Sequence, residues 1–408
     1  MAINGIDGMV GVLDRPFMTP PKKVSLLTIS LRGGGAERQV ATLANTGTFH
    51  RVYLLEGDIQ YFLRHDIVNC LFKPSSQPGV CKLIRIPLSI FKLFKLTKQE
   101  THLISFMERA NFVNIFLKLL RPHKAIVSVR TSTRGIKRIN RTLMKLLYPF
   151  ADHIVVNSEG SKDGILKMLG WQASRVSVIH NALDHALIQE YLSAETNDDL
   201  PKTRYMVWCG RFIPSKNPLA MVKVFHHLKQ LSSCRDITLV MLGNGPHLAP
   251  IQEWVAHHGL YDAVLFPGFT ENPYHFFSNA MAFVHTSDME GFPNVVIEAM
   301  ACGVPVVVTD CEYGPREILD PKKTIPKGPL TQVVLAEFGV LVPVISSAES
   351  PATQSLSINE QQLAAGICSL VESSDRMIHY QRQSSVRAAQ FSVNDINAQW
   401  HRLVEGLA

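Results

Sequence analysis

Two glutamates lie eight residues apart in the sequence SDMEGFPNVVIEAMACGVPVVVTDCEYGPREIL, which begins at Ser287. Glu290 lies in a predicted loop, and Glu298 lies in a helix that we expect to begin near Pro293. The backbone N–H groups of residues 294–296 would then have no intrahelical partner, which suits a phosphate group. Glu298 could accept hydrogen bonds from ribose hydroxyls, and Glu290 could reach a sugar. The same spacing also fits solvated glutamates on a surface helix.

Two cations, Arg211 and Lys216, follow a predicted strand in the sequence WCGRFIPSKNP. At the carboxyl end of that strand they could stabilise the negative charge that develops on a pyrophosphate leaving group. Solvated loop cations are the alternative interpretation. The sequence LGNGP places Gly243, Asn244 and Gly245 after another strand, where the backbone can approach a ligand closely.

A glycine cluster, Gly33 to Gly35 in LRGGGAERQ, lies between a predicted strand and a predicted helix. It has neither the G-x-G-x-x-G spacing of a dinucleotide-binding fingerprint nor the G-K-[ST] ending of a Walker loop. It predicts a turn that is flexible or accepts an anion, and a plain tight turn is the alternative. Among the scattered histidines only His285, at a strand end before the Glu290 loop, is kept as a candidate.

These segments belong to two successive series of short apolar strands separated by helical intervals. The predicted strands are 24–31, 51–55, 101–106, 125–129, 153–157 and 176–180 in the first series, and 205–209, 238–242, 264–267, 282–285 and 304–309 in the second. Such alternation predicts an α/β protein with two parallel sheets, each covered by helices on both faces. The ligand sites of two such domains meet in the cleft between them.

The domain organisation follows from these series. We predict a leader at residues 1–22, an N-terminal Rossmann-like domain at 23–190 and a C-terminal Rossmann-like domain at 204–380, joined by a polar linker. Residues 320–357 are interpreted as an extended loop with one short strand. The segment 390–408 is predicted to contain an amphipathic helix with Ile396, Trp400, Leu403 and Leu407 on one face.

Charge is unevenly distributed along the 408 residues. Residues 1–200 contain 26 Lys and Arg against 16 Asp and Glu, whereas residues 201–408 contain 15 against 18. A basic half can face nucleic acid, an anionic membrane or a phosphorylated substrate. The seven cysteines include no C-x-x-C pair, which argues against a disulfide framework and a zinc knuckle and fits a reducing cytoplasm. No window of eighteen apolar residues predicts a membrane span.

Taken in order along the chain, the motifs GGGAER, VVNSEG, VIHNALD, GRFIPSKNP, LGNGP, LFPGFTENP and E-x7-E resemble those of the retaining glycosyltransferases of family four. The resemblance covers nearly the whole chain. It implies the GT-B architecture: two Rossmann-like domains, an interdomain cleft and a C-terminal helix that crosses back to the N-terminal domain. It also implies that the N-terminal domain, residues 23–190 with the helix in 390–408, binds the acceptor, and that the C-terminal domain, residues 204–380, binds the nucleotide sugar. It also implies transfer of a sugar from a nucleotide diphosphate with retention of configuration, without a metal or another cofactor.

The resemblance implies roles for particular residues. Arg211 and Lys216 would hold the diphosphate, and Glu290 the donor sugar. Arg130 takes the place where many relatives have a histidine that contacts this sugar. The catalytic residues so predicted are Glu290, Arg211, Lys216 and Arg130. The donor-binding residues so predicted are Glu298, Gly34, Gly35, Gly243, Asn244, Gly245, Phe292, Pro293, Asn294 and Val295, and no metal ligand is predicted.

The motifs EGFPNVVIEAM and GPREIL resemble those of a subgroup that uses UDP-linked N-acetylhexosamines. This favours a glycan or a lipid-diphosphate-linked glycan as acceptor, in cell-surface polysaccharide biosynthesis. A sugar-nucleotide epimerase of the same fold is an alternative, and so is a non-catalytic nucleotide- or nucleic-acid-binding protein. Nucleic acid is not expected as a partner, because the basic residues alternate with aliphatic rather than aromatic side chains.

The segment CKLIRIPLSIFKLFKLTK, residues 81–98, contains nine Leu, Ile or Phe residues and five Lys or Arg residues. A helix of this composition can lie in the interface of an anionic bilayer. The alternative is a crossover helix that packs its apolar face on the sheet, with Pro87 producing a kink in either case. We therefore predict a cytoplasmic protein that contacts the inner face of the cytoplasmic membrane peripherally through residues 81–98.

Overall fold

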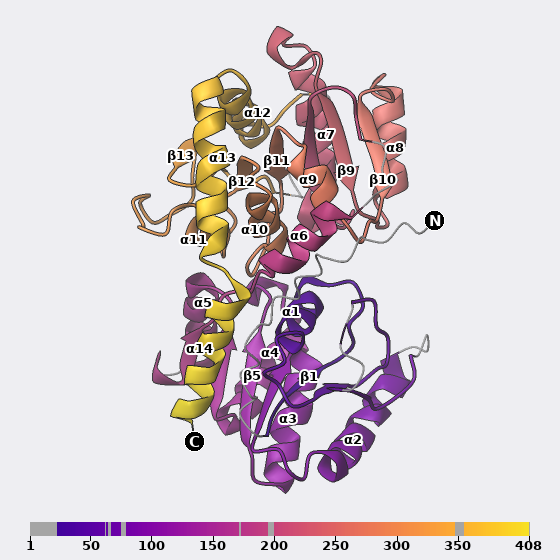
Figure 1. The fold of residues 1–408 in the computed structure, drawn as a ribbon, viewed down its shortest axis with the longest axis vertical. Helices are drawn as coiled ribbons and strands as arrows, with labels where there is room; N and C mark the ends of the chain where they lie inside the picture. The colour runs from indigo at the N-terminus through magenta and orange to yellow at the C-terminus, as the bar shows by residue number, and fades with distance from the viewer. Residues whose placement is uncertain are drawn as a thin grey trace, which may run out of the picture.

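The computed structural model describes residues 23–61, 63, 67–74, 79–170, 173–194, 200–346 and 355–407. These residues form two α/β domains, one below the other in Figure 1, each built on a seven-stranded sheet. This confirms the predicted fold class. The predicted leader, residues 1–22, lies outside the described residues.

The first sheet is parallel in every described strand pair. Its strands lie in the order β3 (Val68–Cys70), β2 (Val52–Leu54), β1 (Val24–Thr28), β4 (His102–Phe106), β5 (Lys124–Val129), β6 (His153–Val156) and β7 (Val176–Val178). The helices are α1 (Gly35–Ala44), α2 (Gly79–Leu96), α3 (Glu108–Leu120), α4 (Arg138–Leu147) and α5 (Glu159–Leu169). Every residue of β1 and β4 is buried, because side chains on both faces of the sheet are covered.

The second sheet has the same plan with one antiparallel edge strand. Its strands lie in the order β10 (Val264–Gly268), β9 (Thr238–Leu242), β8 (Tyr205–Cys209), β11 (Ala282–His285), β12 (Val306–Thr309), β14 (Gly339–Val342) and β13 (Val334–Ala336). Its helices are α7 (Pro218–Leu228), α8 (Leu248–His257), α9 (Tyr274–Ser278), α10 (Asn294–Ala301), α11 (Pro315–Leu319), α12 (Ile358–Val371) and α13 (Ser374–Ala389). The prediction of one strand within residues 320–357 was wrong, because β13 and β14 form a hairpin there.

The boundary predicted at residue 190 falls inside a helix, α6 (His185–Ser193). Asp184 caps this helix by accepting a hydrogen bond from the Leu187 N–H at 3.1 Å. Ile188 packs in a core cluster of the second domain together with Phe276, and α6 contacts α9. The structure therefore moves the boundary upstream of α6, which belongs to the second domain.

Helix α14 (Val393–Gly406) returns to the first domain, as predicted. Figure 1 shows it leaving the upper domain and lying along the lower one. Ile396, Trp400 and Val404 belong to the core cluster that contains the β1 side chains, and the Trp400 ring lies 5.8 Å from the Phe106 ring. The return segment pairs with the first connection between the domains, since Leu183 N–H donates to Phe391 O and Val393 N–H donates to Leu183 O.

Candidate active site

The loop after β8 is fixed in the second domain from two directions. Thr286, just beyond β11, donates a hydrogen bond to the Lys216 carbonyl at 2.7 Å and accepts one from Trp208 Nε1 at 2.9 Å. Asp288 N–H donates to Ser215 O at 3.0 Å. The carboxyl ends of the neighbouring strands β8 and β11 thus place Lys216 beside the loop that carries Glu290.

Lys216, Glu290 and His285 form a buried polar cluster. Lys216 Nζ forms an ion pair with Glu290 Oε1, and His285 Nε2 lies 3.0 Å from the same oxygen. The side chains of His285 and Glu290 are only 3% and 13% exposed. Lys216 and the candidate His285 therefore both contact the same carboxylate oxygen of Glu290.

Electrostatics set the protonation of this cluster. Burial raises the pKa of Glu290, but Lys216 and the hydrogen bond from His285 outweigh burial and hold that pKa well below its usual range. Burial lowers the pKa of His285, although Glu290 opposes the shift. At neutral pH Glu290 is a carboxylate and His285 is neutral, so His285 donates from Nε2. Its Nδ1 is buried and has no hydrogen-bond partner among the described residues.

Helix α10 begins at Asn294, and Glu298 lies in its second turn, as predicted. The Glu298 side chain is 6% exposed and pairs with Arg38 of α1, whose Nη1 lies 2.6 Å from Glu298 Oε1. This ion pair joins the two domains. The sequence prediction missed Arg38, although the quoted motif GGGAER contains it.

The N-terminal end of α10 contacts the glycine cluster of the first domain. Asn294 Nδ2 donates to Gly35 O at 3.1 Å, and a Cβ atom added at Gly35 would lie 3.1 Å from the same Nδ2. Asn181 donates to Asn294 Oδ1 at 2.5 Å and to Phe292 O at 3.3 Å. Phe292 itself is buried against Phe391. Gly34 precedes α1 as its N-cap, so Gly34 and Gly35 lie at the domain boundary, beside Asn294.

Gly243 and Gly245 pack closely against the backbone of the Arg211 loop. A Cβ atom at Gly243 would lie 2.0 Å from Gly210 O, and one at Gly245 would lie 2.6 Å from Phe212 O. Gly243 has φ +127°, a conformation that favours glycine. Phe212 N–H donates to Asn244 O at 3.0 Å. The close approach that the sequence predicts is therefore made to the backbone of the Arg211 loop, which these residues hold in place.

The Arg211 side chain is exposed. Burial raises the pKa of Glu37 in α1, and the positive charge of Arg211 opposes that shift. The charge of Arg211 thus acts on Glu37, the residue before Arg38 in α1.

Arg130 is held by several contacts of the first domain. Its guanidinium donates to Ile179 O at 2.9 Å, to Asn181 Oδ1 at 3.0 Å and to Ser128 Oγ at 2.7 Å. It also lies over the ring of Trp400, 5.5 Å from the centroid. Burial lowers the pKa of this guanidinium to about 9, and it still stays charged at neutral pH. These contacts all lie within the first domain and α14, and they include Asn181, which itself contacts Asn294 of α10. The contact of Arg130 with the donor sugar stays a prediction.

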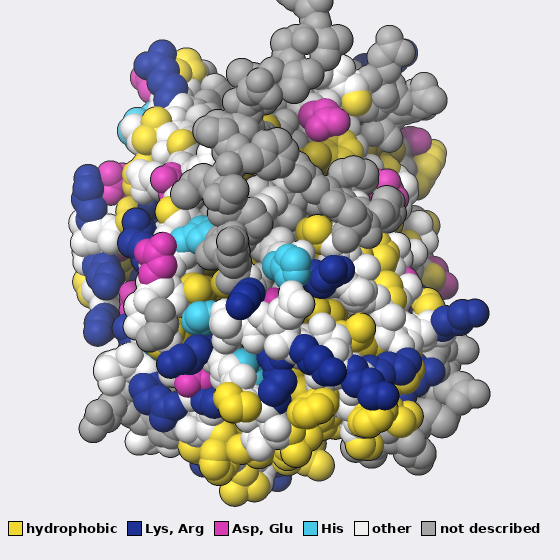
Figure 2. All heavy atoms as spheres, turned by 60° about the horizontal axis from the view of Figure 1, so that its bottom comes forward, with side chains coloured by type: hydrophobic (Ala, Val, Ile, Leu, Met, Phe, Trp, Pro, Cys, Tyr) yellow, Lys and Arg dark blue, Asp and Glu magenta, His cyan; other side chains and the backbone are white. Residues whose placement is uncertain are grey.

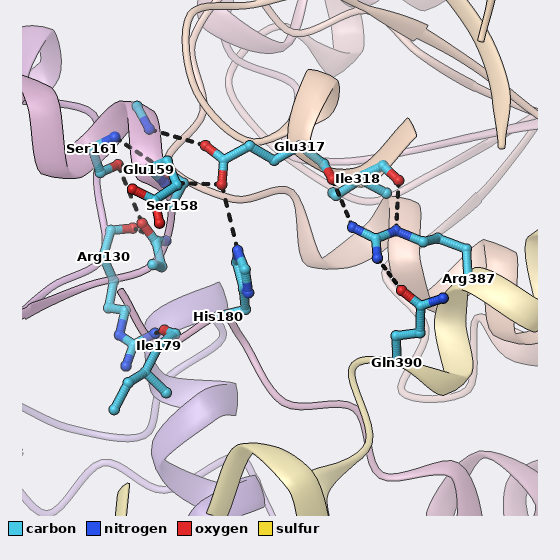
Figure 3. Close-up of polar contacts among 12 residues, drawn as sticks. Arg130, Ser158, Glu159, Ser161, Ile179, His180, Glu317, Ile318, Arg387 and Gln390 are labelled. Atoms are coloured by element: carbon cyan, nitrogen blue, oxygen red, sulfur yellow. Dashed lines mark hydrogen bonds and ion pairs between the residues drawn. The ribbon is translucent and has the colours of Figure 1, made fainter. Parts of the chain in front are cut away.

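Glu317 of α11 links the two domains on the other side of α10. Figure 3 shows its carboxylate reaching the N-terminal end of α5, where it accepts hydrogen bonds from the N–H groups of Glu159 and Gly160, both at 2.9 Å. His180 Nε2 lies 3.4 Å from the same carboxylate. Arg387 of α13 holds the Glu317 carbonyl at 2.6 Å. A carboxylate at a helix N-terminus is favourable, and here the helix belongs to the opposite domain.

No group of three or more His, Cys, Asp or Glu residues suited to a metal ion is found in the part of the chain that the structure describes. Two sheets with switch points facing each other, a buried Lys–Glu pair and a helix N-terminus between them define a GT-B glycosyltransferase site.

Comparison with known families gives the same class. Residues 33–187 match the model of "Glycosyltransferase Family 4", and residues 195–335 match that of "Glycosyl transferases group 1". The chain thus belongs to the family four, group 1 glycosyltransferases, and it is an enzyme that transfers a sugar.

Relatives align over most of the chain. The N-acetylgalactosamine-N,N'-diacetylbacillosaminyl-diphospho-undecaprenol 4-alpha-N-acetylgalactosaminyltransferase of Campylobacter jejuni is 26% identical over 387 residues, covering 91% of this chain and 96% of the relative. A second C. jejuni alpha-1,4-N-acetyl-D-galactosaminyltransferase, which acts on a diNAcBac-PP-undecaprenol-linked glycan, is 26% identical over 73% of this chain and 82% of its own. Anabaena HepE, solved with UDP and glucose, superposes with a TM-score of 0.72 at 19% identity, covering 94% of this chain and 100% of HepE.

Proposed function

We propose that this enzyme transfers an N-acetylhexosamine from its UDP derivative, with retention of configuration, to a lipid-diphosphate-linked glycan used in building a cell-surface polysaccharide. The observation that carries the proposal is the ion pair of Lys216 with Glu290 in the loop that leads into α10. Glu298 lies in the second turn of that helix. Cations and helix N–H groups suit a diphosphate, and carboxylates suit the hydroxyls of a ribose and a sugar.

The comparisons support the substrates of this proposal. Two relatives have names that specify N-acetylgalactosaminyl transfer to undecaprenol-linked glycans, and a structural neighbour was solved with UDP. The alignments cover 96% and 82% of these two relatives, so the similarity extends over both of their domains and not over one segment alone.

The proposed reaction breaks the bond between the anomeric carbon of the sugar and the β-phosphate oxygen. The acceptor hydroxyl oxygen forms the new bond to that carbon on the same face, and its proton passes to the departing phosphate oxygen. Lys216 and Arg211 stabilise the charge that grows on the diphosphate. Ionised Glu290 accepts a hydrogen bond from a donor-sugar hydroxyl, and Glu298 accepts hydrogen bonds from the ribose. No step needs a metal ion.

The first expected result concerns the donor. A UDP-N-acetylhexosamine at about one hundred times its Kd should raise the free energy of unfolding by about 2.7 kcal/mol. Transfer to a lipid-diphosphate-linked glycan should then release UDP at the same rate with and without EDTA. Thermal unfolding with a panel of nucleotide sugars, followed by a UDP-release assay, measures both. If millimolar nucleotide sugars give no stabilisation, the donor assignment is wrong, and loss of activity in EDTA would contradict metal independence.

We also propose that the enzyme contacts an anionic membrane through an apolar face formed by α2 and the end of α3. The exposed apolar side chains of this face are Leu88, Phe91, Phe94, Leu96, Phe116, Leu119 and Leu120. Figure 2 shows hydrophobic side chains gathered on the lower side of the molecule, with Lys and Arg side chains beside them. The described part of the chain contains no helix that is long and apolar enough to cross a membrane.

Helix α2 has features of both predicted roles of residues 81–98, a crossover helix packed on the sheet and a helix in a membrane interface. Leu93 is fully buried in a core cluster with Leu27 and Leu103, so one stripe packs on the sheet. Leu88 and Phe91 on another stripe are 48% and 58% exposed, which is unusual for large apolar side chains on a helix whose inner stripe is already packed. The exposed Lys95 and Lys98 lie beside them. A helix with an outer apolar stripe and adjacent lysines fits the interface of an anionic bilayer.

The second expected result concerns this contact. Replacing Lys95 and Lys98 with glutamine should weaken binding to anionic vesicles by about 2 kcal/mol, because each basic residue contributes roughly 1 kcal/mol near such a surface. Vesicle sedimentation at several salt concentrations measures the effect. Ile358→Ser, which changes an apolar side chain that is 73% exposed in the second domain, is the control. Equal binding of the wild type to neutral and anionic vesicles, or binding that salt does not weaken, would contradict the proposal.

A further inference from the structure

Asn181 lies at the boundary between the two domains, in the loop that follows β7. It is only 4% exposed, and its side-chain amide contacts both domains. The Oδ1 atom accepts a hydrogen bond from Arg130 of the first domain at 3.0 Å. The Nδ2 atom donates to the second domain, to Asn294 Oδ1 at 2.5 Å and to Phe292 O at 3.3 Å. This amide therefore fixes residues 292–294 relative to the first domain.

The partners determine which way each amide faces. A guanidinium group only donates, so Asn181 Oδ1 must face Arg130 and Nδ2 must face the second domain. A carbonyl group only accepts, so Asn294 Nδ2 faces Gly35 O and Asn294 Oδ1 faces Asn181. The four residues form one chain of hydrogen bonds, from Arg130 through both amides to Gly35. Neither amide can be reversed without breaking hydrogen bonds on both of its sides.

The backbone that carries Asn181 is held on both sides. Arg130 also donates to Ile179 O at 2.9 Å, as Figure 3 shows. Gln39 of α1 forms two hydrogen bonds with the backbone of Ala182, since its Nε2 donates to the carbonyl at 2.9 Å and its Oε1 accepts from the N–H at 2.5 Å. The Asn181 side chain therefore extends from a segment that two other parts of the first domain hold in place.

The loop before α10 approaches the first domain at a second point. A Cβ atom added at Gly291 would lie 2.9 Å from Arg130 O and 3.1 Å from Asn157 Nδ2. Asn157 itself donates to Arg130 O at 3.3 Å. Arg130 thus borders this loop with its carbonyl at Gly291, and it acts through Asn181 on the other side of Phe292. The loop is positioned by the first domain at both places.

The N-terminal end of α10 depends on these contacts. Its N-cap residue, Pro293, forms no side-chain cap. Both hydrogen bonds that the structure describes for the Asn294 side chain go to the first domain, to Asn181 and to Gly35. The free N–H groups of the helix belong to the second domain, and the first domain orients the residue that begins the helix.

We infer that Asn181 is a positioning residue of the transfer reaction, which orients the N-terminal end of α10 toward the donor diphosphate from the opposite domain. The inference rests on the proposed function and adds a residue that acts through Phe292 O and Asn294 Oδ1 rather than on a substrate. Loss of Asn181 should therefore weaken the contact with the diphosphate. It should have little effect on the ribose, which is assigned to Glu298.

The test compares UDP with UMP, which lacks the β-phosphate. Calorimetric titration of the full chain gives the Kd of each nucleotide, and the ratio of the two constants reports the contact with the diphosphate. We expect the wild type to prefer UDP. Asn181→Ala should reduce this preference about tenfold, because two hydrogen bonds that orient the start of α10 are lost. The affinity for UMP should change little.

A double-mutant cycle tests whether the two amides act together. Asn294→Ala should also reduce the preference for UDP, because it removes the acceptor of Asn181 and the contact with Gly35. The double variant should reduce the preference hardly more than Asn181→Ala alone, since residues that act as one unit are not additive. A reduction equal to the product of the two single effects would overturn the inference.

Two other asparagines provide controls. Asn114→Ala removes a buried amide in the core of the first domain, where Nδ2 donates to Leu103 O at 2.8 Å. It should lower the unfolding temperature and leave the preference for UDP unchanged. Asn279→Ala changes an exposed residue of the second domain and should alter neither quantity.

The outcomes separate this inference from the donor proposal. A wild-type preference for UDP that Asn181→Ala retains would overturn the inference, and so would an equal loss of preference in Asn114→Ala. A wild type that binds UDP no better than UMP would contradict the donor proposal itself, and the inference would fail with it.

Discussion

Replacing Lys216 with methionine is expected to lower kcat about 10²- to 10³-fold, the usual effect of removing one group that stabilises charge in the transition state. Lys216 forms an ion pair with Glu290 beside the predicted diphosphate position, so the variant loses a positive charge where negative charge develops. The KM for the nucleotide sugar should change less than kcat, because the charge on the diphosphate grows during bond breaking. Steady-state UDP release measures both constants.

The same substitution leaves Glu290 buried without its cation, which should lower the free energy of unfolding by about 3 kcal/mol. A double variant, Lys216→Met with Glu290→Gln, removes the unpaired negative charge of Glu290 and should recover much of that stability. Its kcat should stay low. Lys327→Met is the matched control, because this lysine of the second domain is exposed. Full activity of Lys216→Met would show that the cation has no part in the chemistry.

Replacing Glu298 with glutamine is expected to weaken UDP binding about 10- to 100-fold, because hydrogen bonds to a charged acceptor are worth about 1.5–3 kcal/mol. The carboxylate is 6% exposed and pairs with Arg38 of the opposite domain at 2.6 Å. The variant therefore affects two interactions, one with the ribose and one between the domains. Calorimetric titration with UDP measures the first, and thermal unfolding without UDP measures the second.

A second substitution separates the two effects. Adding Arg38→Met to Glu298→Gln removes the unpaired guanidinium and should restore most of the unfolding temperature. UDP affinity should remain weak, since the ribose acceptor is still missing. Recovery of UDP affinity in this double variant would show that Glu298 acts only through Arg38.

Most of the fold could be predicted from the sequence, because parallel strands buried on both faces are written as continuous apolar runs such as VSLLT and HLISF. Three elements escaped this pattern, and one of them is a strand of the β13–β14 hairpin. Strand β3 is only three residues long and partly exposed, so its sequence VNC carries little apolar signal. Helix α6 lies mostly in the predicted N-terminal domain and ends in the predicted linker, although Ile188 packs in the second domain.

The sequence was sufficient to predict which residues lie near the site, but not which side chains contact one another there. The loop motifs place Lys216 and Glu290 at adjacent strand ends, and the structure joins them. The direction of a long side chain depends on tertiary neighbours, which local sequence does not specify. Arg130 is drawn to the Ile179 carbonyl and to the ring of Trp400, which lies far along the chain in α14. The Arg38–Glu298 pair likewise exists only once the two domains meet.

The return of α14 has a consequence for biosynthesis of the chain. Domains generally fold as units while the ribosome is still adding residues. The core around β1 of the first domain includes Ile396, Trp400 and Val404, so residues 24–178 emerge long before the helix that completes their packing. The second domain, although translated later, has residues 205–389 available before α14 is made. The half that is synthesised first is therefore the half that finishes folding last, and until then the side chains that pack with Trp400 lack this partner.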